Sequence, residues 1–232
     1  MATFVLVPGA WLGSWVWKKV TPLLREKGHE VHTISLTGMG ERVHLANKDY
    51  GIEVAIKDVT NLIEFEDLKD VVLIGHSFAG KVVAAVADRI PDSIRLIVYL
   101  DAIRPEKVRT PQCSFDPTEE FGEQSPESIS IPLTVEIVDI IGKDVQGEDR
   151  QWLLSKSTGW PIKLATDEII LSEKFDAVKS AYIFCTESGD PVDEILEGKW
   201  GKLDGPAKTI ESGHWPMITR PEELARDLID LL

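Results

Sequence analysis

Short apolar runs alternate with amphipathic stretches along the chain, and this alternation predicts repeated strand–helix units. Four consecutive apolar residues at 71–74 indicate a strand that is buried on both faces. Apolar residues then recur at helical spacing from Val82 to Ala87, until Pro91 ends the run. Further strands are predicted at residues 3–7, 30–36, 96–100, 181–185 and 207–210. Strands and helices in alternation predict one α/β domain over residues 1–232, with a mostly parallel sheet flanked by helices.

The stretch between the fourth and fifth predicted strands breaks this alternation. Residues 103–175 contain six prolines and no convincing buried strand, and helices are predicted there only at 133–141 and 149–154. Long connections in compact domains are usually functional. We therefore interpret the stretch at about 103–175 as a small helical cap, inserted between late strands and lying over the functional site.

Amphipathic helices are also predicted at 15–24 and 52–63, and a final helix begins with the capping pattern at 219–222. Pro22 fits only near a helix start, so a break is expected near Thr21 in the first of these helices.

A serine occupies the sharp break after the strand at 71–74. Gly75 and Ala79 flank Ser77, and small residues are needed where the chain folds back on itself. This pattern is typical of a nucleophile elbow, which holds a serine hydroxyl above the edge of the sheet. The short motif has little weight alone, so the prediction depends on the strand before it, the helix after it and the partners downstream.

A serine hydroxyl needs a base that takes its proton, and the base needs an acid that orients it. His214 follows the last predicted strand, and its loop returns to the edge of the sheet where Ser77 is expected. Asp190 follows the strand at 181–185 and gives the order serine, acid, histidine, so we predict it as the acid. Asp101, at the end of the strand at 96–100, is the main alternative. Two further carboxylates in the same region are Glu187 and Asp193.

Two backbone N–H groups must stabilise the negative oxygen that forms during attack on a carbonyl. We predict an oxyanion hole from the N–H of Phe78, directly after the serine, and that of Ala10, in the loop after the first strand. Aromatic residues of that loop and of the cap are expected to line a substrate pocket. They are Trp11, Phe115, Trp152 and Trp160.

Charge and composition exclude several kinds of partner. The chain has 25 Lys and Arg against 39 Asp and Glu, for a formal net charge of −14, which argues against nucleic acid and anionic membranes. Its two cysteines are far apart and predict neither a disulfide framework nor a metal site. No apolar run approaches ~18 residues, and the N-terminus lacks signal-peptide features, so a cytoplasmic location is expected.

These motifs resemble the α/β-hydrolase superfamily over nearly the whole chain. Within it, the chain is similar to the small group of plant methylesterases, hydroxynitrile lyases and bacterial carboxylesterases, including pyrethroid-hydrolase-like enzymes. The matching stretches are residues 4–11, 36–42, 75–80, 98–102 and 213–217. The family usually has His-Gly where this chain has Pro8-Gly9, and we interpret Pro8 as holding the oxyanion loop by its rigidity instead.

The resemblance implies a serine hydrolase without cofactor or metal, with Ser77 as nucleophile, His214 as base and Asp190 as acid. Its expected substrate is a small hydrophobic or aromatic carboxylic ester, cleaved through an acyl-enzyme. One alternative is a hydroxynitrile lyase on the same triad, and another is a non-catalytic protein that binds a small ligand. The lyase would need a pocket cation, for which the cap offers Lys143, Lys156 and Lys163. Either a monomer or a homodimer is compatible with the sequence.

Overall fold

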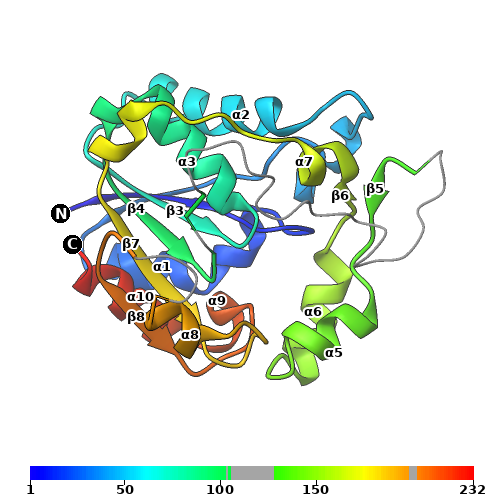
Figure 1. Ribbon diagram of the computed structural model, residues 1–232. Helices are drawn as coiled ribbons and strands as arrows, with labels where there is room; N and C mark the ends of the chain where they lie inside the picture. The colour runs from blue at the N-terminus through cyan, green and yellow to red at the C-terminus, as the bar shows by residue number, and fades with distance from the viewer. Residues whose placement is uncertain (103, 106–127, 199–202) are drawn as a thin grey trace.

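A six-stranded parallel sheet forms the centre of the computed structural model, which describes residues 1–102, 104–105, 128–198 and 203–232 (Figure 1). The strand order is β2-β1-β3-β4-β7-β8, and every neighbouring pair is parallel. The strands are β1 (Thr3–Val7), β2 (Glu30–Thr33), β3 (Val71–His76), β4 (Ile94–Leu100), β7 (Ser180–Cys185) and β8 (Ala207–Ile210). All six predicted strands are present, although β2 ends three residues before the predicted limit at residue 36.

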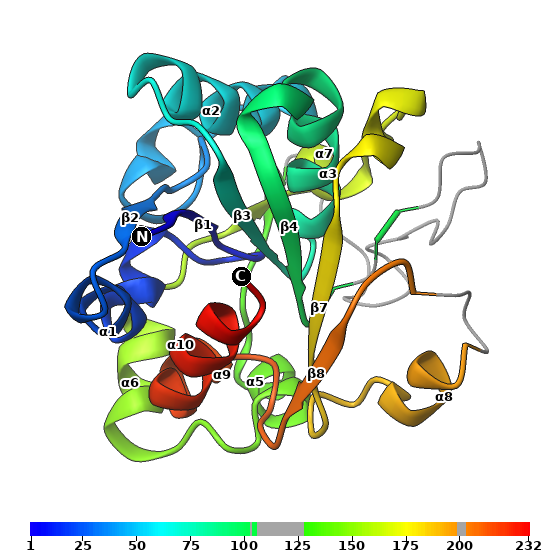
Figure 2. The same cartoon turned by 90° about the vertical axis from the view of Figure 1, so that its left-hand side faces the viewer.

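Helices cover both faces of the sheet (Figure 2). One face carries α2 (Ile52–Phe65) and α3 (Ala79–Arg89), and the other carries α1 (Val20–Glu26) and α10 (Pro221–Asp230). The predicted first helix is divided into a 3₁₀ helix, η1 (Ser14–Lys18), and α1. The division falls at Lys19, close to Thr21 as expected, and Pro22 is accommodated within the first turn of α1. The remaining helices of these layers are η2 (Gly40–Leu45), η3 (Pro91–Ser93), α8 (Val192–Leu196) and α9 (Pro216–Thr219).

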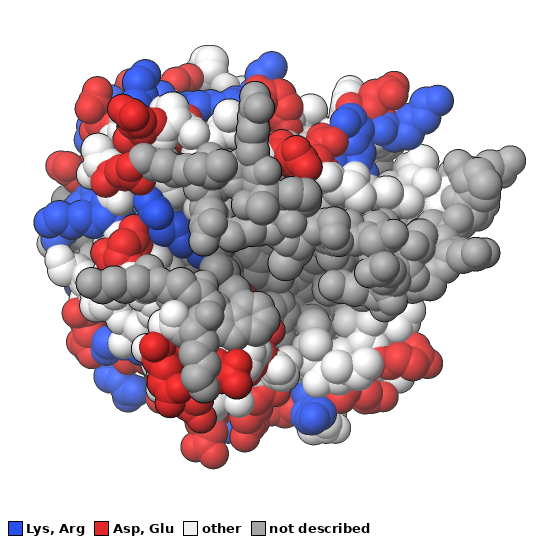
Figure 3. Space-filling model, viewed as in Figure 1, with Lys and Arg blue, Asp and Glu red and all other residues white. Residues whose placement is uncertain are grey.

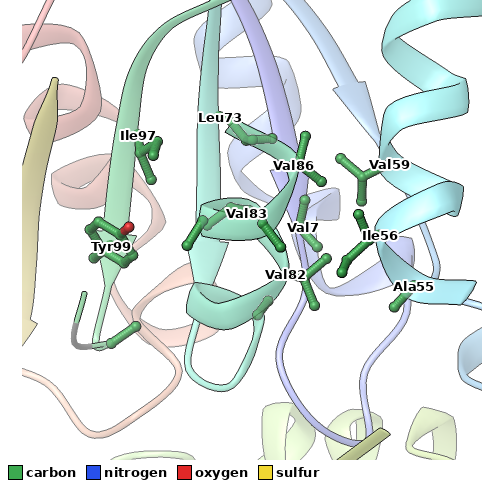
Figure 4. Packing of buried hydrophobic residues seen from close by; sticks show 14 of the residues in the cluster. Val7, Ala55, Ile56, Val59, Leu73, Val82, Val83, Val86, Ile97 and Tyr99 are labelled. Atoms are coloured by element: carbon green, nitrogen blue, oxygen red, sulfur yellow. The ribbon is translucent and has the colours of Figure 1, made fainter. Parts of the chain in front are cut away.

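The alternation of side chains along each strand divides the core into two clusters, one on each face of the sheet. Val5, Val7 and Leu73 point to the α2–α3 side, whereas Phe4 and Leu6 point to the α1–α10 side. Figure 4 shows the first cluster, in which valines of α3 interdigitate with α2 and with β1, β3 and β4. Burying one such side chain contributes about 1.5–3 kcal/mol, so this packing fixes the position of α3 and of the turn that precedes it.

We call the chain between β4 and β7 the insertion. Of its described residues, those at 128–166 lie beyond the sheet edge toward which β3 and β4 point (Figure 1), whereas those at 173–177 pack against α3 and η3 near the other edge. Both predicted helices are present, as α5 (Val135–Ile141) and α6 (Gly147–Lys156). A short antiparallel ladder, which the sequence did not predict, joins two further segments of the insertion. The other elements are β5 (Ser130–Ile131), β6 (Trp160–Pro161), α7 (Ile162–Thr166) and η4 (Glu173–Ala177).

The surface reflects the acidic composition of the chain. Acidic side chains gather along the lower edge of the face in Figure 3, in the region of α8 and β8. In the described ranges, every helix is too short or too polar to cross a membrane.

Candidate active site

Ser77 lies on the turn between β3 and α3, as the sequence predicted. Its φ is +55°, a left-handed conformation that costs a residue with a side chain about 1–3 kcal/mol. A methyl group added at Gly75 would lie 2.5 Å from Val83 Cγ2, which explains the need for glycine at this close approach. The Ser77 N–H donates to the carbonyl oxygen of Leu100 (3.0 Å), so the serine lies directly beside the end of β4.

Asp101 is the carboxylate that contacts His214. His214 Nδ1 lies 2.5 Å from Asp101 Oδ2, and Asp101 is only 4% exposed. The other carboxylate oxygen accepts from the Cys185 N–H (2.9 Å). Burial raises the pKa of Asp101, but the hydrogen bond and charge of His214 and the Cys185 N–H outweigh it, so the pKa falls below its usual range. Asp101 is therefore held ionised against the histidine.

Asp190, which we predicted to orient His214, does not make this hydrogen bond. It lies on an exposed part of the loop between β7 and α8. Loss of hydration and the negative charge of Asp101 raise the pKa of the Asp190 carboxyl. Asp101, the alternative considered from sequence, is adjacent to Ser77 through the β3–β4 pairing, whereas the Asp190 loop follows the next strand of the sheet. The other two rivals, Glu187 and Asp193, are exposed.

The loop after β1 meets the serine turn at Gly9. A methyl group added at Gly9 would lie 3.1 Å from Ser77 Cβ and 2.5 Å from His76 Nδ1. Ala10 follows directly and is buried, and Phe78 begins the turn into α3. Within the described residues, neither the Ala10 N–H nor the Phe78 N–H donates to a backbone acceptor. The structure thus places both predicted oxyanion donors beside the serine turn.

Trp11, next in this loop, has a φ of +66°, which is uncommon for a residue with a large side chain. Its indole Nε1–H donates to the carbonyl oxygen of Ile131 (3.0 Å), and its own carbonyl accepts from the Thr158 N–H (2.9 Å). Both partners belong to the insertion, which is therefore bound directly to the loop that carries Ala10.

His76 binds the loop that carries His214. Its Nε2–H donates to the His214 carbonyl oxygen (2.7 Å), and the two ring centroids are 4.6 Å apart. Complete burial and the nearby charge of His214 lower the pKa of His76 to about 3, so His76 is neutral at ordinary pH. The insertion also binds this loop, because the His214 N–H donates to the carbonyl oxygen of Ile141 (2.8 Å).

The two histidine contacts and the β3–β4 pairing bring Ser77, His214 and Asp101 to one edge of the sheet. The hydrogen bonds of the described residues do not include one from Ser77 Oγ to His214. Catalytic hydrogen bonds are often long or poorly aligned before substrate binds. The arrangement is suited to nucleophilic attack by a serine whose base is oriented by a buried carboxylate. The other histidines have partners elsewhere: His29 with Ala2, His32 with Glu30 and His44 with Glu41.

The aromatic residues predicted to line a pocket have different surroundings. Trp11 and Trp160 are almost fully buried and contact each other edge to face, with ring centroids 5.6 Å apart. Trp152 packs edge to face on Trp15 at 5.0 Å, away from the serine turn. Phe115 lies outside the described residues. Phe78, Leu133 and Ile141 have partly exposed apolar side chains that pack against the α2–α3 cluster. Phe78 directly follows Ser77, and the Ile141 carbonyl oxygen binds the His214 loop. Of these three, the sequence pointed only to Phe78, for its N–H group.

No group of three or more His, Cys, Asp or Glu side chains within the described residues is arranged to hold a metal ion. Lys163, one of the three cations considered for a lyase, is exposed and pairs with Asp167 Oδ1 (2.6 Å). Lys143 and Lys156 are also exposed.

Comparison with known proteins defines the class. A model of the Alpha/beta hydrolase family matches residues 4–227, and the chain belongs to this family. The carbendazim hydrolyzing esterase of Nocardioides sp. (strain SG-4G) is 34% identical over 253 residues, covering 100% of both chains. The polyneuridine aldehyde esterase of Rauvolfia serpentina is 28% identical and covers 98% of this chain and 94% of its own.

A solved structure shows the same fold. The extracellular alpha/beta-hydrolase from a Paenibacillus species has a TM-score of 0.83 at 24% identity, over 100% of this chain and 99% of that one. The resemblance and the α/β-hydrolase fold expected from the motifs are confirmed.

Proposed function

We propose that this protein is a serine esterase that needs no cofactor and cleaves small hydrophobic or aromatic carboxylic esters. The observation that carries the proposal is the single sheet edge where Ser77, the His214–Asp101 pair and the Ala10 and Phe78 N–H groups meet. The carbendazim hydrolyzing esterase and the polyneuridine aldehyde esterase, both similar over nearly the full chain, support the same reaction class.

The mechanism follows from the roles that these positions allow. His214 Nε2 takes the proton of the Ser77 hydroxyl, and Oγ attacks the ester carbonyl to form a tetrahedral intermediate. The Ala10 and Phe78 N–H groups donate to its negative oxygen. The C–O bond to the alcohol then breaks, and the alcohol leaves with the proton from His214. Water, activated in the same way by His214, attacks the acyl-enzyme and releases the carboxylic acid.

Asp101 takes the role of the acid in this proposal, in place of Asp190. Its contact with Nδ1 keeps the proton of the neutral imidazole on that nitrogen, so that Nε2 is free to accept the proton of Ser77. The depressed pKa of Asp101 keeps the carboxylate charged, which stabilises the imidazolium that forms when Ser77 gives up its proton.

The insertion is proposed to act as a cap that limits substrate size. It binds the Trp11 loop through Ile131 and Thr158, and it binds the His214 loop through Ile141. The partly exposed side chains of Phe78, Leu133 and Ile141 offer apolar contacts to the acyl or alcohol group. A neutral ester also avoids the repulsion that a net charge of −14 would exert on an anionic substrate.

The two alternatives that the sequence left open gain no support from a specific observation. A hydroxynitrile lyase would need a cation at the site, but the three candidate lysines of the insertion are exposed. A role as a non-catalytic ligand-binding protein would leave the paired His214 and Asp101 without a use. The expected cytoplasmic location, and the choice between monomer and homodimer, stay predictions.

Hydrolysis of p-nitrophenyl acetate and butyrate by the wild type and by Ser77→Ala tests the proposal. We expect turnover by the wild type and a loss of about 10⁴–10⁶-fold in kcat for the variant. The matched control is Ser155→Ala, because Ser155 lies exposed on α6 and only donates to Trp152 O there. A folded wild type that cleaves neither ester would refute the esterase, and cyanohydrin cleavage would then be assayed. A fully active Ser77→Ala would refute the nucleophile.

A further inference from the structure

The loop that carries Ala10 is held in place from outside the sheet. Ala10 follows β1 by three residues, and the described structure gives the N–H of Ala10 no backbone acceptor that would fix its direction. Its neighbour Trp11 is in a left-handed conformation, with φ at +66°. Backbone conformations of this kind persist only where the surroundings over-determine them, and they cluster at functional sites. The turn is closed by a hydrogen bond from the Leu12 N–H to the Gly9 carbonyl oxygen (3.4 Å), and the contacts that hold Trp11 fix the direction of the Ala10 N–H together with it.

The insertion supplies the groups that hold Trp11. The indole Nε1–H donates to Ile131 O at 3.0 Å, and Thr158 N–H donates to Trp11 O at 2.9 Å. These two residues lie in or beside the β5–β6 ladder, so one short piece of the insertion fixes both the side chain and the backbone of Trp11. Trp11 is 5% exposed, and its indole donor has an acceptor that is well placed for a hydrogen bond between buried groups.

An aromatic contact extends this anchor to the second oxyanion donor. The Trp160 ring in β6 packs edge to face on Trp11, with centroids 5.6 Å apart, and lies 5.2 Å from the Phe78 ring. Trp160 thus contacts the residue beside Ala10 and also Phe78 itself. The two N–H groups come from loops far apart in the sequence, and Trp160 bridges them through side chains.

We propose that Trp11 is a positioning residue, which aligns the Ala10 N–H with the Phe78 N–H by anchoring the loop after β1 to the insertion. This inference rests on the proposed esterase function. The insertion then completes the catalytic machinery in addition to covering it. Because the oxyanion forms only when the carbonyl is attacked, a misaligned Ala10 N–H weakens binding of the transition state more than binding of the ester.

Trp11→Phe is the informative variant, because it keeps an aromatic ring and removes the Nε1–H donor to Ile131. Removal of a whole oxyanion donor costs ~10²–10³-fold in kcat, and a displaced donor is expected to cost about tenfold or more. KM for p-nitrophenyl acetate should change by less than about threefold. The inhibition constant of a methyl trifluoromethyl ketone, which forms a tetrahedral adduct with Ser77, should rise by the same factor as kcat falls.

Trp15→Phe is the matched control. Trp15 also packs edge to face on a tryptophan of the insertion, at 5.0 Å, but it lies in η1, away from Ala10. Its buried Nε1 makes no hydrogen bond within the described structure. The control should keep kcat and ketone inhibition within about twofold of the wild type, with thermal unfolding recorded for both variants. If Trp11→Phe does not fold, Trp160→Phe, which weakens the bridge to Phe78, should give the same selective loss of kcat.

The outcomes separate the inference from the function on which it rests. A wild type that hydrolyses no ester refutes the esterase, and the inference fails with it. An active wild type whose kcat and ketone inhibition are unchanged in Trp11→Phe refutes the inference alone. Equal losses in Trp11→Phe and Trp15→Phe, with matching falls in thermal stability, also refute it, because they indicate general loosening of the insertion.

Discussion

Replacing Asp101 by Asn tests the assignment of the acid most directly. Asn is nearly isosteric with Asp, and it tolerates left-handed backbone, which Asp101 adopts with φ at +44°. The side-chain oxygen that faces the Cys185 N–H must remain an acceptor, since that N–H is 2.9 Å away. The amide NH₂ of the introduced asparagine then faces His214 Nδ1 and donates to it.

This orientation reverses the tautomer of His214. A nitrogen that accepts a hydrogen bond carries no proton in the neutral imidazole, so the proton moves to Nε2, where Ser77 needs an acceptor. The opposite amide orientation would place two donors against each other at Cys185. In the triad of a serine protease, the same change of the acid lowers kcat about 10⁴-fold. We expect a loss of about 10³–10⁴-fold here, or roughly 4–5.5 kcal/mol of transition-state stabilisation.

The assay compares Asp101→Asn with Asp190→Asn, using initial rates of p-nitrophenyl acetate hydrolysis and the Ser77→Ala protein as the blank. Asp190 is exposed and makes no contact with His214 Nδ1, so its variant should retain activity within about twofold. Near-UV circular dichroism establishes that both variants are folded. A loss of 10³-fold or more in Asp190→Asn (about the size expected for the true acid), with Asp101→Asn nearly active, would refute our reasoning and restore Asp190 as the acid.

Two further predictions concern Gly9 and His76, which pack against each other beside Ser77. Gly9→Ala should destabilise the fold by about 1–3 kcal/mol in urea unfolding and lower kcat, because the new methyl group would lie 2.5 Å from His76 Nδ1. A variant as stable and active as the wild type would contradict this close packing. His76 has a pKa of about 3 in the folded protein and about 6.5 when unfolded, so the unfolded chain binds more protons between pH 3 and pH 6.5. The free energy of unfolding therefore rises with pH over this range and levels off above about pH 6.5. At pH 5 the free energy of unfolding of the wild type should be about 2 kcal/mol lower because of His76, and His76→Gln should lack this loss. Parallel curves of stability against pH for the two proteins would contradict the prediction.

Hydrophobic pattern was enough to predict the sheet and the serine turn. The strands are short and continuously apolar because both faces are buried. The tight turn at Ser77 leaves little space beside it, and the small residues Gly75 and Ala79 at these positions can be read directly from the sequence. The order of segments also brings His214 to the same edge as Ser77, since the loops after parallel strands all return there. These inferences depend on local pattern and on topology alone.

The conformation of Trp11 and the short β5–β6 ladder could not be predicted in this way. Tryptophan rarely adopts a positive φ, and Trp11 does so because Ile131 and Thr158, more than 100 residues away in the chain, bind it. The two-residue strands are too short to show an alternation of apolar and polar positions. Both features are set by tertiary contacts between the insertion and the sheet.

The choice between Asp101 and Asp190 also depends on tertiary structure, because both satisfy the order serine, acid, histidine. Asp101 ends the strand beside β3, so the pairing that places Leu100 O on the Ser77 N–H also fixes the carboxylate near the serine. Asp190 follows one strand further along the sheet. A strand end positions a side chain more rigidly than an exposed loop does, which favours Asp101 on geometry.

Electrostatics separates the two carboxylates in the same direction. Asp101 has a lowered pKa because His214 and a backbone N–H stabilise its charge, whereas Asp190 has a raised one because it loses hydration and lies near the negative Asp101. A carboxylate whose charge is stabilised in this way is suited to orient an imidazole that becomes positively charged during the reaction. The contact with His214 and the stabilised negative charge both belong to Asp101, so we assign Asp101, and not Asp190, to orient the histidine.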